Sequence, residues 1–183
     1  GLLIICYGKY TKKIESMQAQ EKGYKGTFEL GKTTPSFDLE TAVDNEYPYD
    51  HISPAFLEEK LEQFRGEIKQ VPPQYSAVKV NGKRAYEHAR KGKKIELKIR
   101  DAYIYKFDVD QSSFPKLHFE INCSKGTYIR SLARDLGYAL DSGAYMSSLV
   151  RTSIGDYPLS DAVQISDIRD TEDFFKFARQ LTS

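Results

Sequence analysis

The sequence predicts one α+β domain, because strand-like and helix-like patterns follow one another without the regular βαβ alternation of a parallel sheet. The clearest unit is a strand over residues 117–123 that turns at Gly126 into a helix over residues 129–140. Neither a glycine-rich phosphate loop nor a dinucleotide-binding fingerprint occurs in the chain.

The start of this helix presents an aromatic ring and a guanidinium group, which stays charged at any physiological pH. Thr127 is expected to cap the helix by accepting a backbone N–H. Tyr128 and Arg130 lie off the buried face of the helix, so this corner suits a planar, anionic or carboxylate-bearing group. That buried face is formed by Ile129, Leu132, Ala133, Leu136 and Leu140.

The first third of the chain predicts one strand and one helix. Residues 2–14 begin apolar and become basic, which indicates an irregular or helical lead-in. Residues 24–30 alternate as a strand, and residues 31–50 predict a loop with short extended pieces. Ser53 followed by proline is a helix start, and Gly66 is expected to close that helix.

The central segment predicts a basic hairpin and helix that project from the body. Residues 74–80 are extended, Asn81-Gly82 is a strong turn signal, and residues 85–91 form a short helix that ends at Gly92. Another strand is expected to begin over residues 95–99.

The next strand, over residues 102–110, is expected to pair antiparallel with residues 117–123. It should carry Tyr103, Tyr105, Phe107 and Val109 on one side.

The C-terminal part predicts a strand over residues 145–154 and a loop with a short turn over residues 161–168. An amphipathic end helix follows, whose apolar residues are Phe174, Phe175, Phe177, Ala178 and Leu181.

Composition indicates a polyanionic partner. Residues 65–100 carry 11 basic against 3 acidic residues, a local charge of +8 in a chain whose net charge is +1. No apolar run reaches the roughly 20 residues that cross a bilayer, and no signal peptide is recognisable. The two cysteines fit a reduced cytoplasm, and the histidines and cysteines have no metal-ligand spacing, so neither a membrane nor a metal is expected.

Four motifs resemble the TruB-type tRNA pseudouridine synthases. Residues 70–92 (QVPPQYSAVKVNGKRAYEHARKG) resemble the thumb segment of that family, and residues 123–137 (CSKGTYIRSLARDLG) resemble its arginine-bearing motif. Gly23-Tyr24 followed by Leu30-Gly31 resembles the strand of its active-site tyrosine, and residues 149–152 (LVRT) resemble a later motif that closes the pocket. The resemblance keeps its order from residue 1 to about residue 167.

The resemblance implies the pseudouridine synthase fold, a mixed, mostly antiparallel sheet flanked by helices, with a basic thumb insertion at about residues 71–94. It implies isomerisation of a uridine in the TΨC loop of tRNA (position 55) to pseudouridine, without cofactor or metal. The expected partner is the T-arm of tRNA, and the protein is expected to be a cytoplasmic monomer.

The family's nucleophile is an aspartate in a motif of the form G-x-L-D-P-x-A-T-G. The first residues of this chain resemble those that follow the motif, so the aspartate is expected upstream of Gly1. The chain is thus expected to be a partial catalytic domain that is inactive alone and has no C-terminal PUA domain. Arg130, the arginine that pairs with the aspartate, is expected to be unpaired.

The resemblance assigns roles to five pocket residues. Tyr24 is expected to stack on the flipped base, and the hydroxyl of Tyr128 to assist proton handling. Leu149 is expected to form the wall on the other side of the base from Tyr24, and Asp38 lies near the family's acidic loop position. Arg130 is expected to keep the nucleophile ionised.

The thumb supplies the expected RNA contacts. Tyr75 and Tyr86 interleave aromatic rings with the basic residues, a pattern of RNA-binding surfaces. The expected phosphate contacts are Lys79, Lys83, Arg84, Arg90 and Lys91.

Two other functions stay open from the sequence. The chain could be a non-catalytic RNA-binding module with the same body, or a protein-binding domain whose basic hairpin docks an acidic partner. An aspartate in the family motif would distinguish an enzyme from the non-catalytic RNA-binding module. Absence of tRNA binding at low salt would favour the protein-binding domain.

Overall fold

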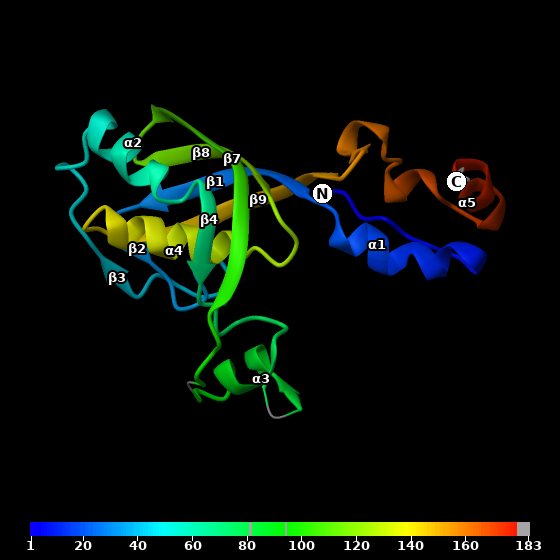
Figure 1. Cartoon of the computed structure of the whole chain (residues 1–183), viewed down its shortest axis with the longest axis horizontal. Coiled ribbons are helices and arrows are strands. Elements are labelled where there is room, and N and C mark those ends of the chain that lie inside the picture. Colours follow the sequence, from blue (N-terminus) through cyan, green and yellow to red (C-terminus); the bar gives the residue numbers. More distant parts are fainter. Residues whose placement is uncertain (81, 94, 179–183) are drawn as a thin grey trace.

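The computed structural model describes residues 1–80, 82–93 and 95–178, and within them the body is a six-stranded antiparallel sheet (Figure 1). The strand order is β10-β9-β1-β8-β7-β4, which confirms the α+β class and the mostly antiparallel sheet. The strands are β1 (Lys22–Leu30), β4 (Gly66–Gln70), β7 (Arg100–Ser113), β8 (Lys116–Cys123), β9 (Ala144–Ile154) and β10 (Tyr157–Pro158).

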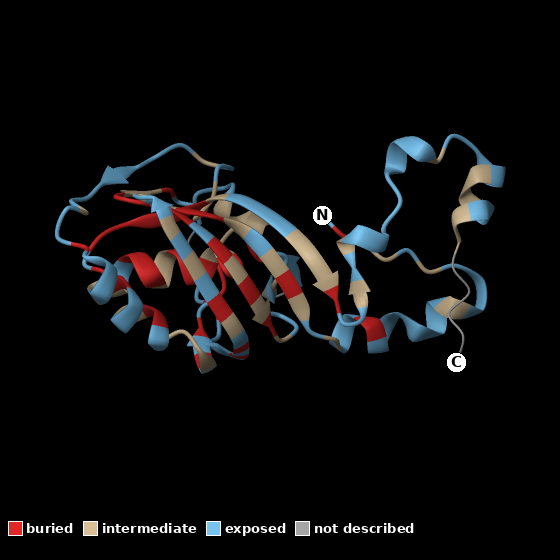
Figure 2. Ribbon diagram, turned by 90° about the horizontal axis from the view of Figure 1, so that it is seen from above, coloured by how far each residue is buried: buried red, intermediate tan, exposed pale blue. Residues whose placement is uncertain are grey.

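Two helices, α2 (Pro54–Glu62) and α4 (Ile129–Ala139), cover one face of this sheet (Figure 1). Leu132, Leu136 and Leu140 are fully buried against the sheet, so the helical face expected from the sequence is confirmed. The expected cap of α2 is also present, since Ser53 Oγ accepts the Phe56 N–H at 3.2 Å. Buried residues concentrate in this body (Figure 2).

The small elements lie outside the main sheet. Two short antiparallel ladders pair β2 (Lys32–Thr33) with β3 (Asn45–Glu46) and β5 (Lys79–Val80) with β6 (Lys83–Arg84). The second ladder and α3 (Ala85–Ala89) form the segment that we call the thumb, residues 71–99, which projects from the body (Figure 1). The β5–β6 ladder confirms the expected hairpin, although Asn81 lies outside the described residues.

Both ends of the chain contribute to a second, smaller lobe beside the sheet (Figure 1). The ring of Tyr7 contacts those of Phe174 and Phe175 at centroid distances of 5.4 and 5.9 Å. The expected lead-in and end helix are thus present, but Leu181 lies outside the described residues. The elements of the lobe are η1 (Gly8–Lys13), α1 (Ile14–Ala19), η2 (Leu159–Asp161), η3 (Ile165–Asp167) and α5 (Thr171–Phe177).

Four expectations about element boundaries and capping were wrong. Helix α2 ends at Glu62, before Gly66. Gly66, whose φ of 79° favours glycine, instead opens β4, a strand that the sequence did not reveal. Most of residues 74–80 and all of 95–99 remain outside strands, because the thumb pairs its peptide groups through side chains and turns. Thr127 does not cap α4: its Oγ1 donates to the Ser124 carbonyl at 2.9 Å, and Tyr128 takes the cap position.

A β-bulge overturns the expected side of β7. Its register against β8 shifts between Ile104 and Lys106, so the alternation of side chains inverts there. Tyr103 and Tyr105 therefore face solvent, whereas Phe107 is 1% exposed in the core.

Among the described residues, no helix is both long and apolar enough to cross a bilayer.

The buried thiol at the end of β8 yields a prediction about reactivity. Burial raises the pKa of the Cys123 thiol to about 11, so at pH 8 this group stays protonated and unreactive, whereas Cys6 is partly exposed. Titration of the native protein with a thiol reagent at pH 8 should show one fast thiol, and two after denaturation. Loss of the fast phase in Cys6→Ser assigns it; two equally fast thiols in the native protein would contradict the burial.

Candidate functional site

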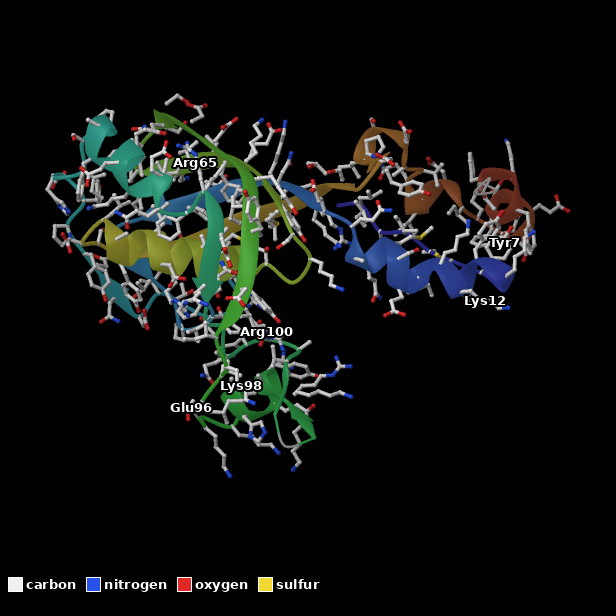
Figure 3. The ribbon with its side chains drawn as sticks, viewed as in Figure 1. Tyr7, Lys12, Arg65, Glu96, Lys98 and Arg100 are labelled. Carbon is white, nitrogen blue, oxygen red and sulfur yellow. The ribbon has the colours of Figure 1, made fainter. Side chains whose placement is uncertain are left out.

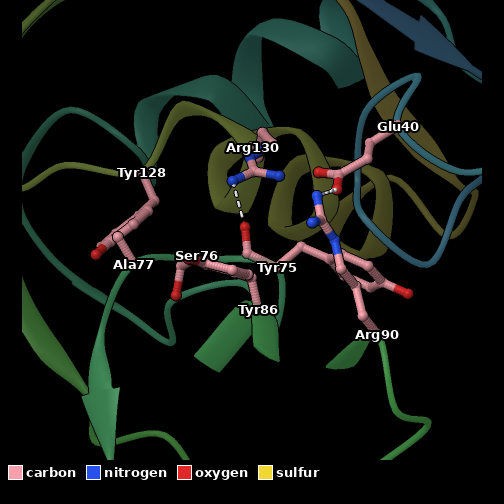
Figure 4. Close-up of a pocket in the computed structure, with 8 residues that line it drawn as sticks. All are labelled: Glu40, Tyr75, Ser76, Ala77, Tyr86, Arg90, Tyr128 and Arg130. Carbon is pink, nitrogen blue, oxygen red and sulfur yellow. Dashed lines mark hydrogen bonds and ion pairs between the residues drawn. The ribbon is translucent and has the colours of Figure 1, made fainter. Parts of the chain in front are cut away.

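A pocket with a cavity volume of about 460 Å³ lies where the thumb meets the body (Figure 4). Three segments that are far apart in the sequence build it: the loop after β2, the thumb, and the start of α4. The lining residues are Glu40, Tyr75, Ser76, Ala77, Tyr86, Arg90, Tyr128 and Arg130. The pocket thus contains Tyr128, Arg130, Tyr86 and Arg90, four of the site residues expected from the sequence.

Arg130 joins these three segments. From α4, its Nη1 donates to Asp38 Oδ2 at 2.9 Å and to the Ser36 carbonyl at 3.4 Å, and its Nη2 donates to the Tyr75 carbonyl at 2.6 Å. The side chains of Arg130 and Asp38 are only 21% and 20% exposed. The expectation of an unpaired Arg130 was therefore wrong, because Asp38 supplies the counter-charge.

The loop that carries Asp38 is held by its own hydrogen bonds. Asp38 Oδ1 accepts the Glu40 N–H at 3.0 Å, and the Asp38 carbonyl accepts the Thr34 hydroxyl at 2.7 Å. The preceding Phe37 adopts a φ of 62°, which bulky residues rarely occupy, and the Arg134 guanidinium lies 5.1 Å from its ring centroid. Loop and helix therefore fix the carboxylate in place before any ligand binds.

Two glutamines secure the root of the thumb by bracketing backbone groups. Gln70, which is 2% exposed, accepts the Tyr128 N–H at 3.1 Å and donates to the Tyr128 carbonyl at 3.3 Å. Gln74 does the same for Ile95, with distances of 3.2 and 2.7 Å. Gln74 thus supplies the peptide groups of Ile95 with the hydrogen bonds that a strand would give, and Gln70 ties the end of β4 to the start of α4.

At the outer side of the pocket, the thumb meets the loop through an exposed ion pair. Arg90 Nη2 lies 3.0 Å from Glu40 Oε1, and the Arg90 guanidinium lies 5.4 Å from the ring centroid of Tyr86 (Figure 4). The two side chains are 65% and 39% exposed.

Tyr24 and Leu149 lie on the same face of neighbouring strands, where Tyr24 packs against the core and Leu149 is 39% exposed. Tyr24 stands opposite Arg151, and Leu149 stands opposite Gly26, so the two side chains lie diagonally across β1 and β9. Burial raises the pKa of the Tyr24 phenol, and the nearby Arg151 guanidinium acts in the opposite direction. Neither Tyr24 nor Leu149 is among the described residues that line the pocket under the thumb.

The remaining expected phosphate contacts, Lys79, Lys83, Arg84 and Lys91, are exposed on the thumb. Lys79 stands directly opposite Arg84 in the β5–β6 ladder, an arrangement of like charges that is unfavourable without an anion. Lys98 and Arg100 continue the positive charge to the root of the thumb (Figure 3).

Two cations of the basic segment are instead held in internal contacts on the body. Arg65 donates to the Phe107 carbonyl at 2.9 Å and pairs with Glu58 at 2.8 Å, and Lys69 pairs with Asp101 at 2.9 Å. The positive surface is thus centred on the thumb.

Sequence reasoning missed Gln70, Ser76 and Glu40, whose importance depends on contacts between distant segments. Ser76 is 4% exposed, and its hydroxyl lacks a hydrogen-bond partner among the described atoms. No cluster of metal-ligating side chains occurs in the described ranges. The arrangement can bind an anionic chain along the thumb and a planar group near Tyr128 and Arg130.

Two family models match consecutive parts of the chain. The model described as "TruB family pseudouridylate synthase (N terminal domain)" matches residues 1–129, and the "tRNA pseudouridylate synthase B C-terminal domain" matches residues 130–180. These matches confirm the resemblance seen in the sequence motifs.

Individual proteins agree with the family models. A protein of Flavobacterium johnsoniae named tRNA pseudouridine synthase B is 50% identical over 166 residues, which are 91% of this chain and 72% of that protein. A Phocaeicola vulgatus protein of the same name is 49% identical over 90% of this chain and 70% of its own. A solved structure of a Cbf5-Nop10-Gar1 complex has a TM-score of 0.66 at 24% identity; the match covers 93% of this chain and 42% of that one, and it shows a shared fold.

The Arg130–Asp38 pair leads to a stability prediction. Asp38→Asn removes the counter-charge of a mostly buried guanidinium, so the free energy of unfolding should fall by about 1–2 kcal/mol. The matched control is Asp101→Asn, which breaks the exposed pair with Lys69 and should cost less than about 0.5 kcal/mol. Urea unfolding measures both variants, and equal losses would show that Asp38 contributes no more than a surface charge.

Proposed function

Because the chain belongs to the TruB family of pseudouridylate synthases, we propose that it forms the body of an enzyme that isomerises the uridine at position 55, in the TΨC loop of tRNA, to pseudouridine. The observation that carries this proposal is the pocket under the basic thumb, where Arg130 and Tyr128 meet the loop of Asp38 and Glu40. A pocket with an aromatic wall and a fixed guanidinium suits a nucleotide turned out of its stack.

In this proposal the thumb binds the RNA backbone. Its exposed cations, among them Lys83 and Arg84, contact phosphates, which position the RNA without reading its sequence. The T-arm is recognised by its shape, and the everted base is read in the pocket.

The proposed roles are those of the pocket residues Tyr128 and Arg130 and of Tyr24 and Leu149, which lie on β1 and β9 outside the lining of that pocket. The ring of Tyr24 restores stacking to the everted base, and Leu149 on β9 forms the apolar wall on the other side of the base. Arg130, oriented by Asp38, keeps the attacking carboxylate ionised, and the Tyr128 hydroxyl handles a proton at the base. Breaking and remaking the bond between base and ribose leaves the composition of the RNA unchanged, so the net reaction consumes no co-substrate; that it uses neither cofactor nor metal is what the family resemblance implies.

The proposal also includes inactivity of these 183 residues alone, since no aspartate in the G-x-L-D-P-x-A-T-G context occurs in the sequence. The Leu2 N–H donates to the Arg151 carbonyl at 2.8 Å, and Arg151 stands opposite Tyr24. An aspartate joined to the chain ahead of Gly1 would therefore enter the site beside Tyr24. We propose a cytoplasmic monomer as the acting form.

Binding of a T-arm RNA hairpin tests the function. Fluorescence anisotropy should show affinity that falls steeply with salt, and Lys83→Gln and Arg84→Gln should each weaken binding and reduce the salt slope by about 1. The control is Lys12→Gln, an exposed cation in the other lobe (Figure 3), which should leave binding unchanged.

Three outcomes would contradict the proposal. Absence of RNA binding at low salt would favour a protein-binding domain. Conversion of the target uridine by the 183-residue chain, detected by chemical mapping of pseudouridine, would show that the chain needs no further aspartate; no conversion when the motif-bearing segment is joined ahead of Gly1 would instead favour the non-catalytic RNA-binding module.

A further inference from the structure

Two arginines line the pocket, and each pairs with a carboxylate of the same loop, yet the two pairs differ in character. Arg130 and Asp38 are both about four-fifths buried, and Arg130 has two further carbonyl acceptors. Arg90 is 65% exposed and Glu40 is 39% exposed. Water and salt screen the second pair strongly, so its net contribution is small and its partners can exchange.

The Arg90 guanidinium is nevertheless well oriented. Arg90 follows α3 and lies 5.4 Å from the ring centroid of Tyr86, a contact that orients a guanidinium without neutralising it. A planar guanidinium presents paired N–H donors that match the oxygens of a phosphate better than a single carboxylate oxygen. Arg90 therefore has the features of a phosphate-binding residue, but in the free protein the Glu40 carboxylate occupies the place where a phosphate would bind.

The parts around this pair are fixed, which confines any exchange to side chains. Asp38 holds the Glu40 backbone at 3.0 Å, Arg130 holds the Tyr75 carbonyl at 2.6 Å, and the Tyr86 N–H donates to the Ser76 carbonyl at 3.0 Å. Loop, thumb root and α3 can keep these bonds while the Glu40 side chain rotates toward solvent.

We propose that Arg90, resting on Tyr86, is a phosphate subsite at the mouth of the pocket, and that Glu40 occupies it in the free protein as a competing anion. An RNA phosphate binds there by displacing the Glu40 carboxylate. Glu40 is thus a negative determinant of RNA affinity that acts through one thumb arginine. The inference rests on the proposed function and adds to it a specific contact and its internal competitor.

The test measures the affinity of the 183-residue chain for a T-arm RNA hairpin at low salt. Glu40→Gln removes the competitor and should tighten binding by about two- to fivefold. Glu46→Gln is the matched control, since it removes the same charge from an exposed position of the same segment, where Glu46 pairs with Lys32, outside the pocket lining. Its effect should be smaller than that of Glu40→Gln.

A double-mutant cycle decides whether Glu40 acts through Arg90. In an Arg90→Gln background, Glu40→Gln should no longer tighten binding beyond the Glu46→Gln control, and Arg90→Gln alone should lower the salt slope by about 1. The advantage of Glu40→Gln should shrink as salt rises, because screening weakens the competing pair.

Two results would overturn the inference while leaving the proposed function intact: equal effects of Glu40→Gln and Glu46→Gln, or a Glu40→Gln effect that persists in the Arg90→Gln background. Failure of the unsubstituted chain to bind the RNA at low salt is a different result, and it would overturn both the proposed function and this subsite.

Discussion

The site depends on the Arg130 guanidinium, because this one side chain joins three segments that are far apart in the sequence. It binds the Asp38 carboxylate, the Ser36 carbonyl and the Tyr75 carbonyl, and thereby links helix α4, the loop after β2 and the thumb. A guanidinium suits this role because it keeps its charge and carries donors that point in several fixed directions. The cost of burying this charge is offset by a carboxylate, which the loop orients through its own hydrogen bonds.

The two arginines of the pocket illustrate how burial separates structural from exchangeable ion pairs. The pair of Arg130 is shielded and supported by carbonyls, so it maintains the architecture. The Arg90–Glu40 pair is open to solvent, and the guanidinium lies over the Tyr86 ring. An anion that binds Arg90 more tightly, such as a phosphate, can therefore replace Glu40. One loop supplies both carboxylates. Asp38 therefore helps to build the pocket, and Glu40, three positions away from the loop's Phe37, competes with other anions for Arg90.

Local patterns allowed the sequence to predict the class, most of the strands and the α4 face, because alternation and helical spacing directly reflect burial. The bulge at Tyr105 was invisible, since one extra backbone residue leaves no signature in composition. The Arg130–Asp38 pair was equally hidden, because it joins positions 92 residues apart and its geometry exists only after folding. Motif resemblance predicted Tyr86, Arg90, Tyr128 and Arg130, which the fold brings to one pocket, whereas the partners of each residue depend on contacts between distant segments.

The ends of the thumb have a further consequence. Gln70, the last residue of β4, stands directly opposite Arg100, the first residue of β7, so residues 71–99 leave and rejoin the sheet at a single rung. An insertion with such closely spaced ends makes few demands on the body, since loop closure becomes only slowly less favourable as a loop lengthens. Evolution or an experimenter can thus exchange or resize this module without altering the register of the sheet, so that the charged surface of the thumb can change while the scaffold is retained.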